Sequence, residues 1–330
     1  MKGAICTLLI LAAAPGYADD QIMGVWQGSY KTVSYESGHL FAQVIAIGGG
    51  AYRAAVRIGE DAPYAPRVVL EGRRQGEAAV FEGEFDLGYD MGGVYQVRAE
   101  LKSGGFEGRF SSAEVSGTFE MSRTEVESPT LGAAAPEGAI VLFDGDDLDD
   151  WVDAKSGKAP RWSLTGDGAV EVGKGNIISR REFGDCKIHV EFRTPYMPDS
   201  SGQARGNSGV YVQGRYEVQV LDSFGLEPKD NLCGGIYKIA APKVNACLPP
   251  LAWQTYDITF YAPRFNASGE KTTNAVITVV HNGEVIHENL PLPEATGGGV
   301  SKKEVARAGL LLQDHGDRVA YRNIWVLSRD

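Results

Sequence analysis

Turn-forming residues recur roughly every ten positions along this chain, and this spacing limits its folding more than any other feature. The turn clusters are rich in glycine, of which the chain has 42, and short runs of Val, Ile, Tyr and Phe lie between them. Short β-branched and aromatic runs separated by turns are typical of antiparallel sheets, whereas helices need longer periodic segments. The sequence therefore predicts an all-β protein, in which residues 301–305 are the one short helix that we expect.

The first 18 residues have the pattern of a secretory signal peptide. Lys2 precedes an apolar run at residues 4–14, and small side chains at Gly16 and Ala18 suit a cleavage site. The run is too short to cross a bilayer, which takes about 20 residues. We therefore expect cleavage after Ala18, a periplasmic or secreted protein, and no membrane insertion.

The net charge excludes one class of partner. The chain carries 43 acidic and 32 basic side chains, which gives a formal net charge of −11 at neutral pH. A negative field repels nucleic acid and anionic lipid, so we expect neither as a partner. The charge alone does not indicate a substrate.

Sequence patterns divide the chain into two β-rich domains. Alternating strands within residues 19–125, each joined to the next by a short turn, predict an antiparallel barrel in an accessory domain that supports the second one or binds a ligand. Residues 126–138 are rich in proline and alanine without periodicity and predict a linker. Residues 139–330 contain a dozen short strands without crossover helices, which predicts a β-sandwich of two sheets.

Two cysteines of the second domain leave two arrangements open. Cys233 and Cys247 flank a loop rich in glycine and proline, which a disulfide would fix in an oxidising compartment. The alternative is a pair of buried thiols that pack as small apolar side chains. The odd number of cysteines in the mature chain does not decide between them, and no Cys/His spacing predicts a zinc site.

Several motifs of the second domain follow one another in a familiar order. They read LFDG at 142–145, DCKIHVEF at 185–192, NSGVYV at 207–212, YEVQVLD at 216–222, WQTYDI at 253–258 and LQDHG at 312–316 followed by YRNI at 321–324. In order and spacing they resemble the 3-keto-disaccharide hydrolase family over about 190 residues. The resemblance implies a concanavalin A-like sandwich, or jelly roll, and action on glycosides already oxidised at the sugar C3.

One strand of the predicted sandwich carries polar side chains on a single face. Alternation places Glu217 and Gln219 on the same side of that strand, and the neighbouring strand adds Asn207, Tyr211 and Gln213. We expect these residues to form a solvated concave surface that binds sugar hydroxyls. The alternative is an ordinary solvent-facing side of a sheet.

The same strand departs from the pattern of ordinary glycosidases, which need two carboxylates near the scissile bond. Glucanases with a similar sandwich carry them on one strand as Glu-x-Asp-x-x-Glu. This chain has Glu217, Gln219 and Asp222 instead, so the middle acid is an amide and the last acid faces the opposite side. The departure argues against an ordinary retaining mechanism.

A 3-keto sugar requires different chemistry, because the ketone makes the C2 proton acidic. Cleavage then needs a base near neutral pH, a donor for the enolate oxygen and an acid for the leaving group. With the family resemblance, we take His315 and its neighbour Asp314 as the base unit, since histidine titrates near neutrality, and we add Glu217 to the catalytic set. The alternative is a surface histidine in a turn. The enzymatic hypothesis requires Asn207, Glu217 and His315 to converge.

Two glycine-rich loops supply further candidates for substrate binding. Arg205 and Lys238 are candidate cations for the enolate oxygen, although a lone loop cation is more often solvated. Tyr237 is a candidate for stacking on a sugar ring. A divalent metal ion held by Glu217 or His315 would be an alternative electrophile, but no metal-ligand spacing is present and no cofactor is certain.

Three functions therefore remain open, all with a carbohydrate as partner. The first is an exported enzyme that cleaves 3-keto-glycosides by C2 proton abstraction and elimination, with net hydrolysis when water adds. The alternatives are a non-catalytic, lectin-like carbohydrate-binding protein and a conventional glucan hydrolase, because a fold does not determine a function.

Overall fold

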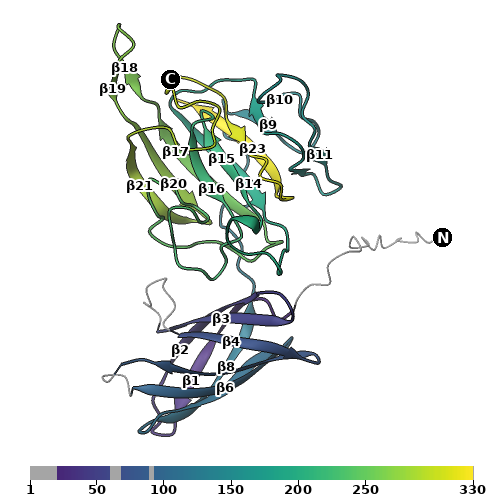
Figure 1. The fold of residues 1–330 in the computed structure, drawn as a ribbon, viewed down its shortest axis with the longest axis vertical. Helices are drawn as coiled ribbons and strands as arrows, with labels where there is room; N and C mark the ends of the chain where they lie inside the picture. Colours follow the sequence, from purple (N-terminus) through teal and green to yellow (C-terminus); the bar gives the residue numbers. More distant parts are fainter. Residues whose placement is uncertain (1–20, 60–67, 89–92, 330) are drawn as a thin grey trace, which may run out of the picture.

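The computed structural model describes residues 21–59, 68–88 and 93–329, so the predicted signal peptide lies outside the described residues. The chain forms a closed barrel followed by a two-sheet sandwich. Figure 1 shows the barrel at the bottom and the sandwich at the top. No helix within the described ranges is long and apolar enough to cross a membrane.

The short helix predicted at residues 301–305 is wrong. That segment forms bends, whereas Gly202–Ala204 forms one turn of 3₁₀ helix. The backbone N–H of Lys303 donates to Ser301 Oγ at 3.0 Å. A serine side chain that bonds locally to the backbone competes with helix formation, which accounts for the difference.

Eight antiparallel strands close the barrel in sequence order, as the alternating pattern predicts. They are β1 (Gly24–Thr32), β2 (Ser37–Ala46), β3 (Ala51–Ile58), β4 (Val68–Gln75), β5 (Ala78–Asp86), β6 (Val94–Lys102), β7 (Gly105–Ser111) and β8 (Ser116–Thr124). Trp26 of β1 pairs with Ala42 of β2 on one side and with Arg123 of β8 on the other. Closure leaves no unpaired strand edge.

The sandwich consists of two antiparallel sheets, which confirms the predicted fold class. The smaller sheet has the order β10 (Trp151–Asp153), β13 (Ile177–Ser179), β22 (Leu311–Leu312), β15 (Ser208–Val212) and β16 (Tyr216–Val220). The larger sheet has the order β11 (Ser163–Leu164), β12 (Val170–Glu171), β23 (Ala320–Ser328), β14 (Cys186–Arg193), β17 (Gln254–Tyr261), β20 (Ala275–His281) and β21 (Glu284–Leu292), with β9 (Ile140–Phe143) paired to β23. Strands β18 (Arg264–Phe265) and β19 (Lys271–Thr273) form a separate pair.

Alternation directs one side of each sheet into a shared hydrophobic core. Val210 of β15 and Val218 of β16 belong to this core, together with Ile188 and Tyr256 of the larger sheet. The opposite side of β15 and β16 is therefore the side that is free to carry polar residues.

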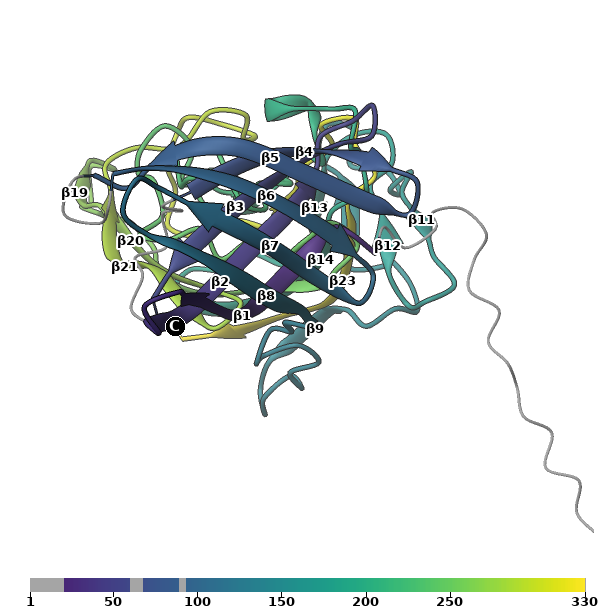
Figure 2. The same cartoon turned by 90° about the horizontal axis from the view of Figure 1, so that it is seen from below.

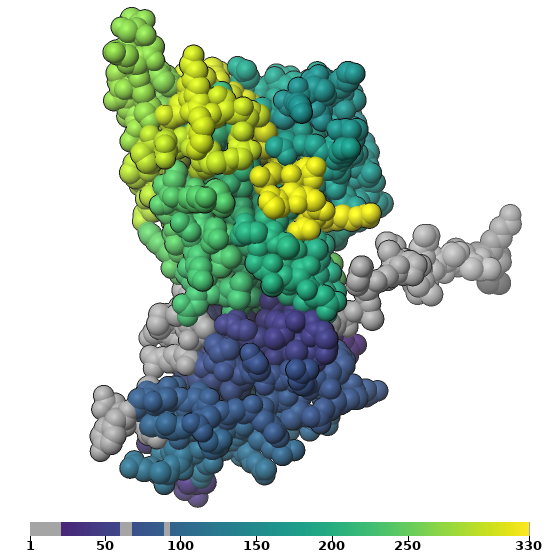
Figure 3. All heavy atoms as spheres, in the orientation of Figure 1, coloured from purple at the N-terminus to yellow at the C-terminus, as the bar shows by residue number. Residues whose placement is uncertain are grey.

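The barrel and the sandwich are in direct contact, and Figure 3 shows the purple atoms of the barrel against the green atoms of the sandwich. Phe224 of the sandwich packs with Val25 and Ile45 on the outer surface of the barrel. The guanidinium of Arg205 also donates to the carbonyl oxygen of Ala46 at 3.0 Å. Apolar packing and a buried hydrogen bond thus hold the barrel and the sandwich together.

Candidate functional site

Strands β15 and β16 bring Tyr211, Glu217 and Gln219 onto one face, as their alternation predicts. Tyr211 lies directly opposite Glu217, and Gly209 lies directly opposite Gln219. A Cβ atom at Gly209 would lie 2.6 Å from Glu217 Oε1 and 2.8 Å from the Tyr211 ring. The absence of a side chain at Gly209 therefore makes room for the carboxylate and the phenol.

Amide side chains form two hydrogen-bonded groups on this face, which together are called the network here. Gln219 Nε2 donates to Asn207 Oδ1 at 3.4 Å and to Gln203 Oε1 at 3.2 Å, and Asn207 Nδ2 donates to the carbonyl oxygen of Gln203 at 2.7 Å. Gln313 Nε2 donates to the Tyr211 hydroxyl at 3.0 Å. Sequence reasoning missed Gln203 and Gln313, although Gln313 stands in the LQDHG motif and was available as a signal.

Two amide oxygens of the network have no partner. Gln219 Oε1 and Gln313 Oε1 are buried without a hydrogen bond among the described residues. Buried polar atoms are almost always paired in folded proteins. These two atoms are therefore suited to accept hydrogen bonds from the hydroxyls of a bound ligand or from water.

The face is buried, so the predicted solvated surface is wrong. Glu217 is 3% exposed and Gln219 is 2% exposed. A Cβ atom at Gly298 would lie 2.5 Å from the Tyr211 hydroxyl, which places that loop directly over the phenol. On the other side, the backbone N–H of Gln219 donates to the carbonyl oxygen of Gly235 at 2.9 Å. The loop at Gly298 thus covers the polar face, and the segment at Gly235 pairs with the edge of β16.

Burial changes the acidity of the two central groups. It raises the pKa of Glu217 to about 7, and the hydrogen bond with Tyr211 opposes this increase only in part. Burial, with the Glu217 charge, also raises the pKa of Tyr211 far above its usual value, so the phenol stays protonated. The site therefore combines a carboxyl that titrates near neutrality with a persistent hydrogen-bond donor, as general acid–base chemistry requires.

Asp314 and His315 lie in a turn beside this network. The Asp314 carboxylate accepts the backbone N–H groups of Gly175 at 2.8 Å and Gly316 at 2.9 Å, so it stabilises the turn. His315 is exposed, and within the described ranges no hydrogen bond or ion pair joins its ring to another residue. The structure thus brings Asn207 and Glu217 onto one face, whereas no described contact joins His315 to either, so the convergence that the sequence predicted is found for Asn207 and Glu217 only.

Arg205 and Gln213 are used for internal contacts. Arg205 Nε donates to Asp222 Oδ2 at 2.6 Å, on the opposite side of β16 from Glu217. Gln213 Nε2 donates to the carbonyl oxygens of Phe183 and Ala306, both at 3.0 Å. The structure does not bring either side chain into the network around Glu217.

Tyr237 and Lys238 lie at the edge of the covering loops. The half-buried Tyr237 ring lies 3.6 Å from the position that a Cβ atom at Gly297 would take. Lys238 is exposed, and its ammonium group lies 5.3 Å from the centroid of the Tyr237 ring. Tyr237 therefore packs against the Gly297 loop, and Lys238 lies beside it.

The described residues show no cluster of three or more His, Cys, Asp or Glu side chains that could hold a metal ion.

Of the two arrangements open for the cysteines, the structure has free thiols. Cys233 and Cys247 are both buried, and Cys233 Sγ lies 3.2 Å from the Tyr256 hydroxyl.

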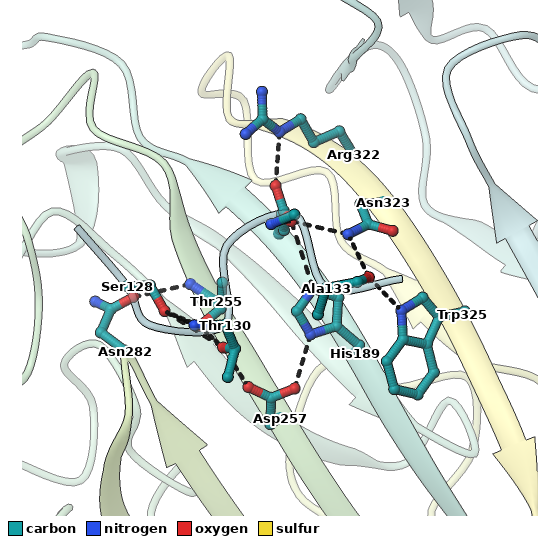
Figure 4. Close-up of polar contacts among 12 residues, drawn as sticks. Ser128, Thr130, Ala133, His189, Thr255, Asp257, Asn282, Arg322, Asn323 and Trp325 are labelled. Carbon is teal, nitrogen blue, oxygen red and sulfur yellow. Dashed lines mark hydrogen bonds and ion pairs between the residues drawn. The ribbon is translucent and has the colours of Figure 1, made fainter. Parts of the chain in front are cut away.

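A second polar cluster lies on the outer face of the larger sheet, where Figure 4 shows residues 128–133 crossing the strands. His189 Nδ1 lies 2.7 Å from Asp257 Oδ1, and the His189 ring stacks on Trp325. Thr130 of the crossing segment donates to Asp257 Oδ2 at 2.6 Å. The cluster thus anchors the segment predicted as a linker.

The charges of this second cluster compensate one another. Burial alone would lower the pKa of His189, but hydrogen bonds with Asp257 and Glu191 outweigh it and raise the pKa to about 9. Burial opposes ionisation of Glu191, yet His189, Asn323 and Arg322 lower its pKa to about 2. Because these groups are already paired with each other, we interpret the cluster as one that stabilises the fold.

Comparison with known proteins gives one family. The model of the 3-keto-alpha-glucoside-1,2-lyase-like domain matches residues 138–327. A solved structure of a candidate glycosyl hydrolase from Parabacteroides distasonis is 37% identical, with a TM-score of 0.55, and the match covers 59% of this chain and 85% of that chain. No curated protein matches this chain.

Two further candidate glycosyl hydrolases from the same organism are more distant. One is 17% identical with a TM-score of 0.45 and coverage of 60% of this chain and 99% of that chain. The other is 20% identical with a TM-score of 0.40 and coverage of 58% and 98%.

Proposed function

The chain belongs to the 3-keto-alpha-glucoside-1,2-lyase-like family, and from this premise we propose that it cleaves 3-keto-glycosides by C2 proton abstraction and elimination. The family and its solved relative indicate a glycosyl-hydrolase-like function. The finer proposal rests on one observation, the buried carboxyl of Glu217 with a pKa of about 7. Its neighbours Tyr211, Gln219 and Gln313 are uncharged, which suits a single base.

In the proposed first step Glu217 removes the proton from C2 of the 3-keto sugar. The electron pair of the C2–H bond forms the C2=C3 double bond, and the ketone oxygen takes the negative charge. Tyr211 donates a hydrogen bond to this oxygen, and a donor at a developing oxyanion lowers the barrier substantially. The amides of Gln219 and Gln313 accept hydrogen bonds from the remaining sugar hydroxyls.

In the second step the enolate re-forms the ketone, a C1=C2 double bond forms and the C1–O bond breaks. The departing oxygen takes a proton from water, because no hydrogen bond or ion pair among the described residues joins His315 to the groups around Glu217. Addition of water to C1 and return of the proton from Glu217 to C2 complete net hydrolysis. An ordinary glucan hydrolase would need a second carboxyl on this face, where β16 has Gln219 instead.

The test uses 4-nitrophenyl 3-keto-α-glucoside with hydrogen or deuterium at C2. We expect release of nitrophenol from the keto-glucoside, slower release from the deuterated substrate, and little release from the unoxidised glucoside. Glu217→Gln should lower kcat by about 10²–10⁴-fold, the usual contribution of a general base. Glu284→Gln, which changes an exposed carboxylate at the start of β21, is the control and should keep full activity.

Three outcomes would contradict this proposal. Equal turnover of the unoxidised glucoside would favour a conventional hydrolase. Full activity of Glu217→Gln would exclude Glu217 as the base. Binding of the keto-glucoside without turnover by the unmodified protein would favour a carbohydrate-binding protein.

We also propose that the reaction takes place outside the cytoplasm, in the periplasm or after secretion. The pattern of residues 1–18 supports this, and residues 139–330 would act as the catalytic domain beside an accessory domain of residues 19–125. N-terminal sequencing of the protein from its native host should begin at Asp19. Retention of Met1 would contradict export by cleavage.

A further inference from the structure

The two halves of the barrel interior differ in packing. In one half Trp26, Phe81 and Phe106 are fully buried, with ring centroids 6.4 Å apart for Trp26 and Phe106 and 5.2 Å apart for Phe81 and Phe106. The other half contains a cavity of about 410 Å³. An eight-stranded barrel is wide enough to be filled by side chains or to hold one small ligand. The size of this cavity falls within the range of about 300–1,000 Å³ that small-molecule sites occupy.

Aromatic rings form much of the cavity wall. Tyr30, Phe85, Tyr95, Phe110 and Phe119 line it among aliphatic side chains. The Phe85 and Tyr95 rings stack at 5.4 Å, with 9° between their planes. Phe85 and Phe110 remain half-buried although they face the interior, as expected for rings that line an open space. Such a wall favours a flat aromatic ligand, because rings stack or pack edge to face on one another.

Acidic side chains at the rim of the cavity disfavour anionic ligands. Among the described residues that line it, Glu36 and Glu114 are the charged ones, and both are exposed in turns between strands. Within the described ranges neither carboxylate has an ion-pair partner. Two carboxylates repel fatty acids and other anions, whereas they accept hydrogen bonds from a hydroxyl or amine.

The cavity lies away from the contact with the sandwich. Contacts with the sandwich come from Ala46, from Gly49 in the β2–β3 turn and from Arg53. The rim is formed by the opposite ends of the strands, at the β1–β2 and β7–β8 turns that carry Glu36 and Glu114. Figure 2, which views the molecule from below, shows the barrel strands in front of the sandwich. The cavity is thus a separate site from the polar face around Glu217.

We propose that the barrel cavity binds one uncharged aromatic molecule of two or three rings, with a hydroxyl or amine directed to Glu36 and Glu114. The rings lie against Phe85, Tyr95 and Phe110 in the cavity. The site is independent of the reaction proposed for the sandwich.

The test compares 2-naphthol with 2-naphthoate, which share the ring system and differ in charge at neutral pH. Isothermal titration of the full chain should show saturable one-to-one binding of 2-naphthol and at least tenfold weaker binding of 2-naphthoate. Val68→Phe, at a buried position of β4 that lines the cavity, should weaken 2-naphthol binding at least tenfold. Val69→Phe, at the neighbouring outward position with 44% exposure, is the matched control and should bind normally.

A second variant keeps the proposal testable if Val68→Phe does not fold. The double substitution Glu36→Gln and Glu114→Gln changes only exposed side chains and should bring 2-naphthoate affinity within a few-fold of 2-naphthol affinity. No saturable binding of 2-naphthol would overturn the proposal, as would equal binding of 2-naphthoate by the unmodified protein. Undiminished binding by folded Val68→Phe would place the ligand elsewhere and overturn it as well.

Discussion

Replacing Glu217 by glutamine should make the protein more stable at alkaline pH while it removes activity. Burial raises the pKa of this carboxyl from 4.5 to about 7, so the folded state binds the proton more tightly than the unfolded state does. The contribution of Glu217 to stability is therefore highest below pH 4.5 and is lost as the pH rises from 4.5 through about 7. Glutamine has nearly the same shape, does not ionise, and still accepts a hydrogen bond from Tyr211.

The size of the effect follows from the shift in pKa. Each pKa unit corresponds to about 1.36 kcal/mol, so a shift of about 2.5 units corresponds to about 3 kcal/mol in the free energy of unfolding. The difference between Glu217→Gln and the unmodified protein should therefore grow from near zero at pH 4.5 to about 3 kcal/mol at pH 8. This value is an upper estimate, because the glutamine amide also loses hydration on burial.

Urea unfolding at pH 4.5 and pH 8, followed by tryptophan fluorescence, measures this difference. Glu284→Gln serves as the control, because an exposed carboxylate is expected to change stability little at either pH. A stability difference for Glu217→Gln that is the same at both pH values would refute the reasoning. A variant less stable than the unmodified protein at pH 8 would refute it too.

Three further predictions concern the structure around the site. Arg205→Met leaves the buried Asp222 carboxylate without its ion-pair partner, so urea unfolding should show a loss of about 3–5 kcal/mol; an unchanged midpoint would contradict the assigned contact. The raised pKa of His189 contributes up to about 3 kcal/mol that is present below pH 6.5 and lost as the pH rises through about 9. The stability difference between the unmodified protein and His189→Gln should therefore shrink between pH 6.5 and pH 9.5, and a pH-independent difference would argue against a charged His189. Ellman's reagent should react with none of the three described cysteines in the folded protein and with all three after unfolding without reductant, because all are free and buried; a lower count after unfolding would indicate a disulfide.

Local patterns predicted much of the fold. The turn spacing predicted the eight strands of the barrel. An Asn-Gly pair, Asn282 and Gly283, joins β20 and β21. Asn282 and Gly283 there have φ of 50° and 86°, the left-handed values that a type I′ turn requires. The predicted helix at residues 301–305 failed because a side-chain hydrogen bond from one residue outweighed a weak periodic signal.

The candidate site was predicted in part. Tyr211, Glu217 and Gln219 share a face because strand alternation is a local property, and the cross-strand register agrees with it. Gln203 was missed because nothing in its own segment indicates what it contacts, whereas Gln313 could have been found from its place in the LQDHG motif. The sequence of the loop at Gly298 also did not indicate that it covers the site, because this depends on the Tyr211 hydroxyl that lies beneath it.

The sequence by itself determined the β architecture, the family and the side chains that share one face of β16. These properties follow from the two-residue period of a strand and from turn chemistry, which act over a few neighbouring residues. Only the tertiary structure decided which polar residues are buried and what each one contacts. Glu217 acquires its raised pKa from loops distant in the chain, and Arg205 binds the carbonyl oxygen of Ala46, 159 positions away. Desolvation and hydrogen bonding depend on the distances between groups in space, which no local pattern contains.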